Sequence, residues 1–362
     1  MTAYVECFNI ELNDYRKRLR IINVDSKVRE MIVKVTASIK DVAIKSGVSV
    51  ATVSHVINNT RFVADSTREK ILAAMEELKY VPNSMARSLR TNKTKTVALL
   101  IPDISNFFFT EVAEAIESVL SEKGYSLFLC NTGENISLEK KQMMLMSSQL
   151  VSGIIIAPTS RDFDYRSMYA DVNYPMVFID RKTNKLQADV VAVDGRTATY
   201  NAVSNLISKG HKRIGYVAGR DGLSTTDERL LGYLEAIEQN GIPIDEKLIK
   251  RGDSKNGSGY QLTEELLKTD ATAIFVSNNL MAVGAIKCLS NEKISIPERM
   301  AIIGFDDYNW STITNPPLST IKQPVAKLGA MAAELVLKRI ENPEGPYIEY
   351  NLPAEFILRK SC

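Results

Sequence analysis

The sequence predicts a small all-α head with a helix-turn-helix, followed by an α/β core of two doubly wound lobes. Three observations lead to this fold class. Between residues 38 and 81, short helical segments with capping residues follow one another, with a glycine in the first turn. From residue 96 onward, short apolar runs alternate with helical stretches. The chain has 362 residues, of which 45% are hydrophobic and 24% charged, enough for two or three domains with a substantial core.

The head begins with two short helices. Ser38 and Asp41 form a Ser-x-x-Asp start for a helix that we expect over residues 39–45. Gly47 lies in the turn that follows, and Ser49 can cap a second helix over residues 50–57. On this second helix one side is apolar and the other is small and polar, with Val53, Val56 and Ile57 on the first and Ala51, Ser54, His55 and Asn58 on the second.

A third helix completes the head. The stretch Ser66-Thr67-Arg68-Glu69 has the form of a capping box, and Ile71, Met75 and Leu78 are its inward residues. Two short helices about three residues apart are the helix-turn-helix arrangement, and a small polar face suits a helix in the major groove. The alternative is a three-helix bundle that binds no nucleic acid. Residues 39–95 carry ten Lys or Arg and five Asp or Glu, a net of +5 against +2 for the whole chain, which favours binding to phosphate.

A short basic segment follows the head. Residues 83–90 can form an Asn-capped helix of about two turns, and isolated helices below roughly 12 residues are marginal in water. We therefore expect this helix to order only on a partner. Its basic residues Arg87 and Arg90, with Lys93 and Lys95, suit phosphates, and Leu89 suits a wedge between minor-groove base steps. A plain basic linker is the alternative for this segment taken alone.

The motifs of residues 38–90 together resemble one known family. They are Ile39-Lys40-Asp41-Val42-Ala43, Gly47-Val48-Ser49-Val50-Ala51-Thr52-Val53-Ser54, Thr67-Arg68-Glu69, Tyr80-Val81-Pro82-Asn83 and Ala86-Arg87-Ser88-Leu89. The chain resembles the lactose-repressor (LacI/GalR) family of bacterial transcription regulators over nearly everything after residue 37, and looks most similar to its ribose-operon and purine-repressor-like members. The resemblance implies that Val50, Ala51 and His55 read bases, that Thr52, Ser54, Asn58 and Asn83 contact phosphate, and that Ala86, Arg87 and Leu89 complete the DNA-binding set. Histidine at position 55, in place of the usual arginine, is similar to the purine-repressor branch.

Composition argues against several other classes of protein. The four cysteines, Cys7, Cys130, Cys288 and Cys362, are widely scattered, and only two histidines accompany them. This pattern disfavours a zinc site or a disulfide framework and suits the cytoplasm. No apolar run reaches the ~18 residues needed to span a bilayer. The sequence shows no phosphate-binding loop of the P-loop type and no histidine beside a plausible nucleophile, so we expect no enzyme, no cofactor and no metal.

Residues 1–37 precede the part that resembles the family. They contain no uncharged run of the kind found in secretory signals. The family's head normally begins near the start of the chain, so we expect Met31 to be the physiological start or residues 1–37 to be an appendage. A functional extra element is the alternative. The intact mass of the native protein distinguishes a late start from a full-length chain.

The core is predicted from two series of apolar runs. The first lies at residues 97–101, 127–130, 154–156 and 176–179, and the second at residues 214–217, 273–276 and 302–305. The resemblance implies that one lobe takes residues 96–193 and 325–351 and the other takes residues 194–323 and 353–362, with the crossovers as hinges. It also divides the rest of the chain into a DNA-binding domain at 38–81 and a hinge and linker at 82–95. Ligands of such sheets bind outside the carboxyl ends of the strands.

Several candidate ligand-binding residues follow these strands. By position they are Phe108 and Phe109, then Asp180 and Arg181, then Arg229, Asn278 and Asp306. The alternatives are core packing for the phenylalanines and an ordinary solvated charge for Arg229. Carboxylates and amides bind hydroxyls, arginine binds two oxygens at once, and aromatic rings stack on sugars, so together these side chains suit a sugar. The family's core looks like periplasmic sugar-binding proteins, so the resemblance implies a periplasmic-binding-protein-like core, and the family's effector contacts match the same seven residues. Two positions depart from the family pattern: Asn279 replaces the usual aspartate, and Ser254 stands where many members have an aromatic residue.

The resemblance implies a repressor of a carbohydrate-utilisation operon, controlled by a small sugar such as ribose. A homodimer would bind a pseudo-palindromic DNA operator, and because no apolar heptads follow Phe356-Ile357-Leu358, we expect a dimer and not a tetramer. The alternatives are a regulator of the same fold that answers to a purine or to a phosphorylated carrier protein, and a sugar receptor without a DNA-binding role.

Overall fold

The structure, a computed structural model, describes residues 37–58, 60–80, 94–149, 151–165, 167 and 174–362. The chain divides into two compact units, with the boundary between Arg87 and Ser88. The leader over residues 1–36 and the helix expected over residues 83–90 lie outside the described residues. Within the described residues, no helix combines the length and the apolar character that a bilayer crossing requires.

The head contains three described helices, α3 (Ile39–Ser46), α4 (Val50–Asn58) and α5 (Asp65–Glu77). The predicted cap of α3 is confirmed, because the Ser38 side chain accepts a bond from the Asp41 amide and the Asp41 carboxylate accepts one from the Ser38 amide. Gly47 ends α3 with a φ of 69°, a left-handed conformation that glycine adopts without strain. The three helices bury a small core, made of Val42, Ala43, Val53, Val56, Ile71 and Ala74.

The capping box expected at residues 66–69 is wrong. Helix α5 begins at Asp65, and its cap is Ala64, which makes no side-chain capping bond in the described part of the chain. The Ala64 carbonyl instead accepts bonds from the Thr67 and Arg68 amides, and the Asp65 carboxylate lies in the first turn, where the helix dipole favours negative charge. The expected inward residues of α5 are confirmed: Ile71 is fully buried, and Met75 and Leu78 pack partly buried against the same core.

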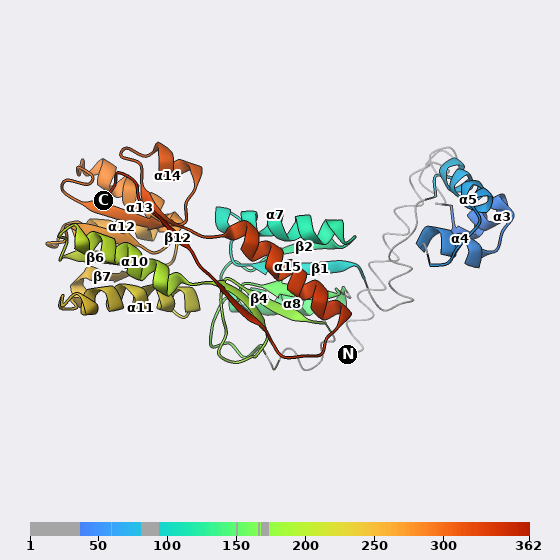
Figure 1. Ribbon diagram of the computed structural model, residues 1–362, viewed down its shortest axis with the longest axis horizontal. Coiled ribbons are helices and arrows are strands. Elements are labelled where there is room, and N and C mark those ends of the chain that lie inside the picture. Colours follow the sequence, from blue (N-terminus) through green and yellow to red (C-terminus); the bar gives the residue numbers. More distant parts are fainter. Residues whose placement is uncertain (1–36, 59, 81–93, 150, 166, 168–173) are drawn as a thin grey trace, which may run out of the picture. The chain divides into compact units, whose positions relative to one another are not determined.

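The core unit contains two six-stranded sheets, one in each lobe (Figure 1). The first has the order β11-β5-β4-β3-β1-β2 and the second β12-β10-β9-β8-β6-β7. Every described strand pair is parallel except β10 with β12, and the predicted doubly wound α/β fold is confirmed. The strands are β1 (Thr96–Ile101), β2 (Ser126–Asn131), β3 (Gly153–Ile156), β4 (Met176–Ile179), β5 (Asp189–Val193), β6 (Ile214–Ala218), β7 (Ile249–Arg251), β8 (Ala273–Val276), β9 (Ala301–Phe305), β10 (Ser319–Lys322), β11 (Glu349–Leu352) and β12 (Glu355–Ile357).

Helices cover both faces of each sheet. Helices α7 and α15 pack together on one face of the first sheet, and the pairs α10 with α11 and α12 with α13 cover the second (Figure 1). The helices are α7 (Phe107–Glu122), α8 (Ile136–Ser148), α10 (Gly195–Ser208), α11 (Ser224–Gln239), α12 (Asn256–Leu267), α13 (Asn279–Asn291), α14 (Asn309–Ile313) and α15 (Val325–Glu341), with a 3-10 helix η1 (Glu246–Leu248). All seven predicted apolar runs form strands of these sheets.

The chain passes between the lobes three times. Strands β5 and β11 belong to the first sheet, and β6, β10 and β12 belong to the second. The chain therefore crosses after β5, after β10 and after β11. The carboxyl ends of both sets of parallel strands therefore face the region where the lobes meet.

Candidate functional site

A cleft lies between the two lobes. The seven side chains predicted to bind a ligand all line it, four from the first lobe and three from the second: Phe108, Phe109, Asp180, Arg181, Arg229, Asn278 and Asp306. Glu134, Ser254 and Gln323 also line the cleft, and we did not predict that Glu134 or Gln323 would do so. The carboxyl-end rule thus brings together residues that are up to about 200 positions apart in the sequence.

The aromatic wall of the cleft is set by a helix cap. Asn106 caps α7, and its Oδ1 accepts a bond from the Phe108 amide at 3.1 Å. This cap directs Phe108 and Phe109 inward, where both are 4% exposed and their rings meet edge to face at 5.0 Å. Phe107 points away, since 59% of it is exposed. Of the three successive phenylalanines, two therefore line the cleft.

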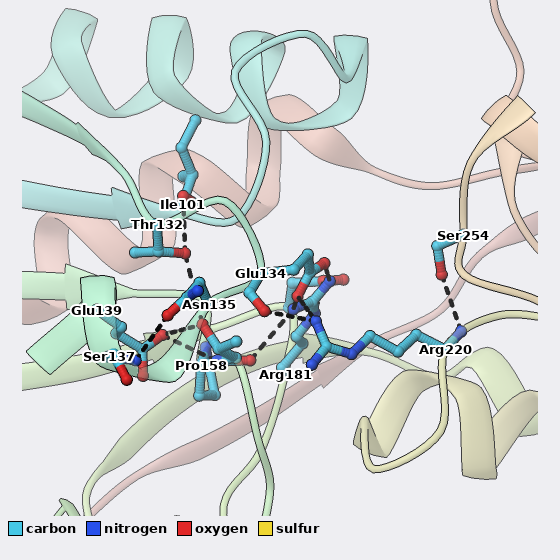
Figure 2. Close-up of polar contacts among 12 residues, drawn as sticks. Ile101, Thr132, Glu134, Asn135, Ser137, Glu139, Pro158, Arg181, Arg220 and Ser254 are labelled. Carbon is cyan, nitrogen blue, oxygen red and sulfur yellow. Dashed lines mark hydrogen bonds and ion pairs between the residues drawn. The ribbon is translucent and has the colours of Figure 1, made fainter.

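Arg181 is held by a carboxylate that we did not predict. Its Nη1 and Nη2 donate to the two carboxylate oxygens of Glu134, at 3.0 and 2.7 Å, and Nη1 also donates to the Pro158 carbonyl (Figure 2). Asp180, which precedes it, has a φ of 65°, and its carboxylate lies 3.6 Å from the Arg181 Nε. Glu134 lies three residues beyond the end of β2, in a Gly-Glu-Asn turn, and nothing in the sequence distinguishes it from an ordinary turn residue.

Arg229 lies in the second lobe, near the start of α11. Its guanidinium lies over the Phe305 ring at 3.6 Å, and its Nη1 donates to the Ser277 carbonyl at 2.7 Å. Helix α11 lies close against α10. The close approach requires glycine at position 232, since a Cβ there would come within 2.2 Å of the Arg196 carbonyl oxygen. The Arg229 guanidinium is thus positioned by the Phe305 ring, by the Ser277 carbonyl and by the close packing of α11 on α10.

Three further residues shape the second-lobe wall. Asp306 has a φ of 70° and accepts a 2.5 Å bond from Gln323, which lies at the second crossing between lobes. Asn278 caps α13 by accepting a bond from the Met281 amide at 3.0 Å. Ser254, with a φ of 66°, accepts a bond from the Arg220 amide at 3.0 Å. Left-handed backbone at Asp180, Ser254 and Asp306 is of the strained kind that gathers at functional sites.

Polar contacts join the lobes beside the cleft. Asn279 donates from its side-chain amide to the Asn106 Oδ1 at 2.8 Å, a bond that an ionised aspartate could not donate, which accounts for the departure at position 279. On another side, the Arg161 amide donates to the Gly222 carbonyl at 3.0 Å, and the Lys182 amide donates to the Ser224 hydroxyl at 2.8 Å. The lobes are therefore held together at more than one point around the cleft.

The cleft contains buried polar atoms that lack a protein partner. Within the described residues, no hydrogen-bond partner exists for three atoms of the lining, the Nε atoms of Arg181 and Arg229 and the Oε1 of Gln323, or for the Oδ1 of Asn279 beside the cleft. Unsatisfied buried polar atoms are rare in folded proteins, and such atoms can still form a hydrogen bond. The three atoms of the lining are therefore available to bond with a polar ligand.

Burial also alters the acidity of the cleft. It raises the pKa of the Asp180 carboxyl to about 6, although the guanidinium groups of Arg181 and Arg229 oppose this rise. Burial also raises the pKa of the Asp306 carboxyl, and the Arg229 guanidinium again opposes the rise. Both carboxylates are thus costly to keep ionised in the cleft.

Replacing Asp180 with asparagine is expected to stabilise the folded protein at neutral pH. Because folding raises this pKa from 3.8 to about 6, the folded chain binds the proton more tightly than the unfolded chain. The stabilisation is complete below pH 3.8 and is lost as the pH rises through 6, a change of about 3 kcal/mol. Asparagine carries no charge and tolerates the left-handed backbone.

Calorimetric unfolding at pH 5 and pH 7.5 measures this effect. Asp180→Asn should gain stability mainly at the higher pH. A loss of stability at pH 7.5 would show that the Asp180 charge stabilises the folded protein.

The predicted DNA-binding residues of α4 lie on its outer face. Val50 and Ala51 are exposed, Thr52, Ser54 and His55 are half-buried, and the helix start is capped by the Ser49 hydroxyl, which accepts a bond from the Thr52 amide at 3.1 Å. The His55 Nδ1 is within hydrogen-bond distance, 2.8 Å, of the Thr60 hydroxyl. The side chain of Asn58, together with Asn83, Ala86, Arg87 and Leu89, lies outside the described residues.

Comparison with known proteins agrees with both units. Residues 38–83 match the family described as bacterial regulatory proteins, lacI family, and residues 203–362 match the periplasmic binding protein-like domain. The chain is 35% identical over 328 residues to the HTH-type transcriptional repressor PurR of Pasteurella multocida, which covers 90% of this chain and 98% of the relative.

Two solved structures extend the comparison. The lac repressor dimer bound to operator and an anti-inducer is similar with a TM-score of 0.80 at 27% identity, over 90% of this chain and 98% of that one. A LacI family regulator from Enterococcus faecium with bound ribose is similar with a TM-score of 0.67 at 31% identity, over 74% of this chain and 98% of that one. The chain therefore belongs to the LacI family of bacterial regulatory proteins, as a DNA-binding transcriptional repressor and not an enzyme.

Proposed function

We propose that this repressor controls a carbohydrate-utilisation operon and that its effector is a small sugar, such as ribose, bound in the cleft between the lobes. The observation that carries this proposal is the large number of hydrogen-bond acceptors in the cleft. Five carboxylates line it: Asp103, Glu134, Asp180, Asp253 and Asp306. A sugar offers a hydroxyl donor on almost every carbon, so it can satisfy many such acceptors, while Phe108 and Phe109 offer apolar contact to its ring.

A purine effector is the second candidate, because relatives at 34–35% identity are PurR repressors. A flat purine is best held between aromatic faces. At position 254 this chain has a serine, whose hydroxyl is already bonded to the Arg220 amide. A purine also has fewer donor groups than a sugar and would bond with fewer of the carboxylate oxygens. We therefore favour the sugar, which the ribose-bound relative also supports.

For DNA binding we propose the domain division expected from the sequence. Residues 38–81 would form the DNA-binding domain, with α4 in the major groove, and residues 82–95 would form the hinge and linker to the core at residues 96–362. Val50, Ala51 and His55 would read bases, and the remaining DNA contacts would be those the resemblance implies. Two protomers, as in the lac repressor dimer, would place two heads on the half-sites of a pseudo-palindromic operator.

The proposed mechanism couples the cleft to the heads through the angle between the lobes. The effector binds residues of both lobes and so stabilises the lobe arrangement that it contacts better. If that arrangement holds the two heads at a different spacing, effector and operator affinities change reciprocally, typically by ~1–3 kcal/mol. Release of DNA by the effector is the outcome that we propose.

One pair of measurements tests the function. Operators are selected from a randomised duplex library with the purified protein, and binding of the selected duplex is followed by fluorescence anisotropy. Ribose, other pentoses, fructose, hypoxanthine and guanine are then titrated calorimetrically and added to the DNA complex. We expect a pentose or hexose to bind and to release the duplex. Tight purine binding without sugar binding would replace the sugar by a purine, and failure to select any duplex at low salt would contradict operator binding.

Changing His55 to alanine is expected to relax base preference at one operator position by ~1–3 kcal/mol. The contact with Thr60 engages the Nδ1 of the ring, so we propose that Nε2 reads the base. The matched control is His211→Ala, because His211 makes a similar Nδ1 contact to Thr272 in the core. Unchanged preference across the randomised library would remove His55 from the base-reading set.

A further inference from the structure

We propose that Glu134 determines which charge of ligand the cleft accepts: by neutralising Arg181 from inside the cleft, it admits uncharged effectors and rejects anionic ones. This inference rests on the proposed effector site. It does not depend on whether the effector is a sugar or a purine, because both are uncharged. It does exclude phosphate esters and carboxylates, which an arginine in a polar cleft would otherwise attract.

The geometry leaves Arg181 little capacity for an anion. A guanidinium binds a carboxylate or a phosphate through two parallel N–H bonds, and both terminal nitrogens of Arg181 already donate to Glu134. The side chains are 7% and 18% exposed, so the pair is shielded from water and salt. A ligand phosphate would therefore have to displace the Glu134 carboxylate before it could reach Arg181.

Glu134 is fixed in this position from both lobes. Its φ of 55° turns the loop between β2 and α8 so that the side chain enters the cleft. From the second lobe, the Arg220 Nη1 donates to the Glu134 carbonyl at 2.5 Å and lies 3.8 Å from its carboxylate (Figure 2). The amide of Arg220 is held in turn by Ser254. Serine at position 254 thus supports the contact that keeps Glu134 in place.

The remaining charges of the cleft also disfavour an anion. Arg229 already attracts two buried carboxylates, Asp180 and Asp306. Lys255 is the other basic residue of the lining, which also holds Asp103 and Asp253. A bound anion would lie among carboxylates in a buried site, where repulsion between like charges is weakly screened. An uncharged ligand meets no such repulsion and can donate to the same oxygens.

The test removes the Glu134 side chain and asks whether an anion takes its place. We expect wild-type protein to bind neither inorganic phosphate nor acetate at millimolar concentration in calorimetric titration. Glu134→Ala should bind both, with an affinity roughly 10- to 100-fold above wild type, because the two released N–H groups of Arg181 form charge-assisted bonds with the anion. Glu134→Gln, which preserves the side-chain volume, should shift the affinity ratio of D-ribose 5-phosphate to D-ribose in favour of the phosphate.

Glu235→Ala is the matched control. Glu235 makes the same two-bond pair with Arg196 on the surface of the second lobe, so its removal releases an arginine outside the cleft. This variant should bind phosphate and acetate no better than wild type. Equal anion binding by wild type and Glu134→Ala would overturn the inference, as would a folded Glu134→Ala and Glu134→Gln pair with no change in anion preference. Failure of every uncharged sugar to bind wild type would instead contradict the proposed sugar effector, whatever the anion titrations show.

Discussion

Replacing Arg229 with alanine is expected to abolish the response to effector and to preserve operator binding in the absence of effector. The guanidinium lies over Phe305, bonds the Ser277 carbonyl and leaves a buried Nε without a partner in the described structure. A ligand in the cleft would accept from this group, and a lost bond to a charged donor costs about 1.5–3 kcal/mol. Effector affinity should therefore fall by roughly 10- to 150-fold from this contact alone.

The same substitution removes a positive charge that favours the ionised forms of the buried carboxylates Asp180 and Asp306. Arg229→Ala therefore also lowers stability unless Asp180 or Asp306 takes up a proton. The double variant Arg229→Ala with Asp306→Asn removes one of these carboxylates as well. It should regain stability but not effector binding, which separates the lost ligand contact from the buried charge.

Calorimetry with the identified effector and anisotropy with the selected operator measure the two effects. Arg196→Ala, which removes a surface arginine of the same lobe, is the control and should retain both activities. An Arg229→Ala protein that still releases DNA at normal effector concentration would show that the effector site lies elsewhere.

Most of the core fold could be predicted because its central strands are apolar along their whole length. Strands such as β3 and β4 are covered on both faces, so every residue is buried and the sequence shows a continuous apolar run. The strands β7, β10, β11 and β12 are short or polar, and β11 has three exposed residues out of four. They are strands because of the neighbours they pair with, which the local sequence does not show. Strand β5 is fully buried and apolar after its first residue, so the same rule could have found it.

The sheet topology made the main residues of the candidate site predictable. The prediction missed other residues of the site because their positions depend on tertiary contacts. Residues that follow parallel strands share one edge of the sheet, so position alone brought Asp180, Asn278 and Asp306 to the cleft. The partners of these residues were not predictable in this way. Glu134 lies in a loop whose Gly133-Glu134-Asn135 sequence is typical of an ordinary turn, and Gln323 contacts Asp306 only because the chain crosses between lobes there.

Replacing Ile71 with alanine is expected to unfold the head and eliminate operator binding, with no effect on effector binding by the core. Ile71 is fully buried in a cluster of only six buried residues. A change from Ile to Ala in a core costs about 2–5 kcal/mol. A domain of about 40 residues has a total stability of roughly 2–6 kcal/mol, so this single change removes most of it. The core has its own hydrophobic clusters and should be unaffected.

The neighbouring residue supplies the control for this experiment. Leu72 lies on the same helix but is 50% exposed, so Leu72→Ala should change the stability of the head by no more than about 0.5 kcal/mol and should retain operator binding. Proteolysis of residues 38–80, operator anisotropy and effector calorimetry are measured on both variants. Since head and core form separate compact units, loss of DNA binding with normal effector affinity in Ile71→Ala would assign DNA recognition to the head. If Ile71→Ala binds the operator normally although its head is cleaved rapidly, DNA recognition must reside in another part of the chain.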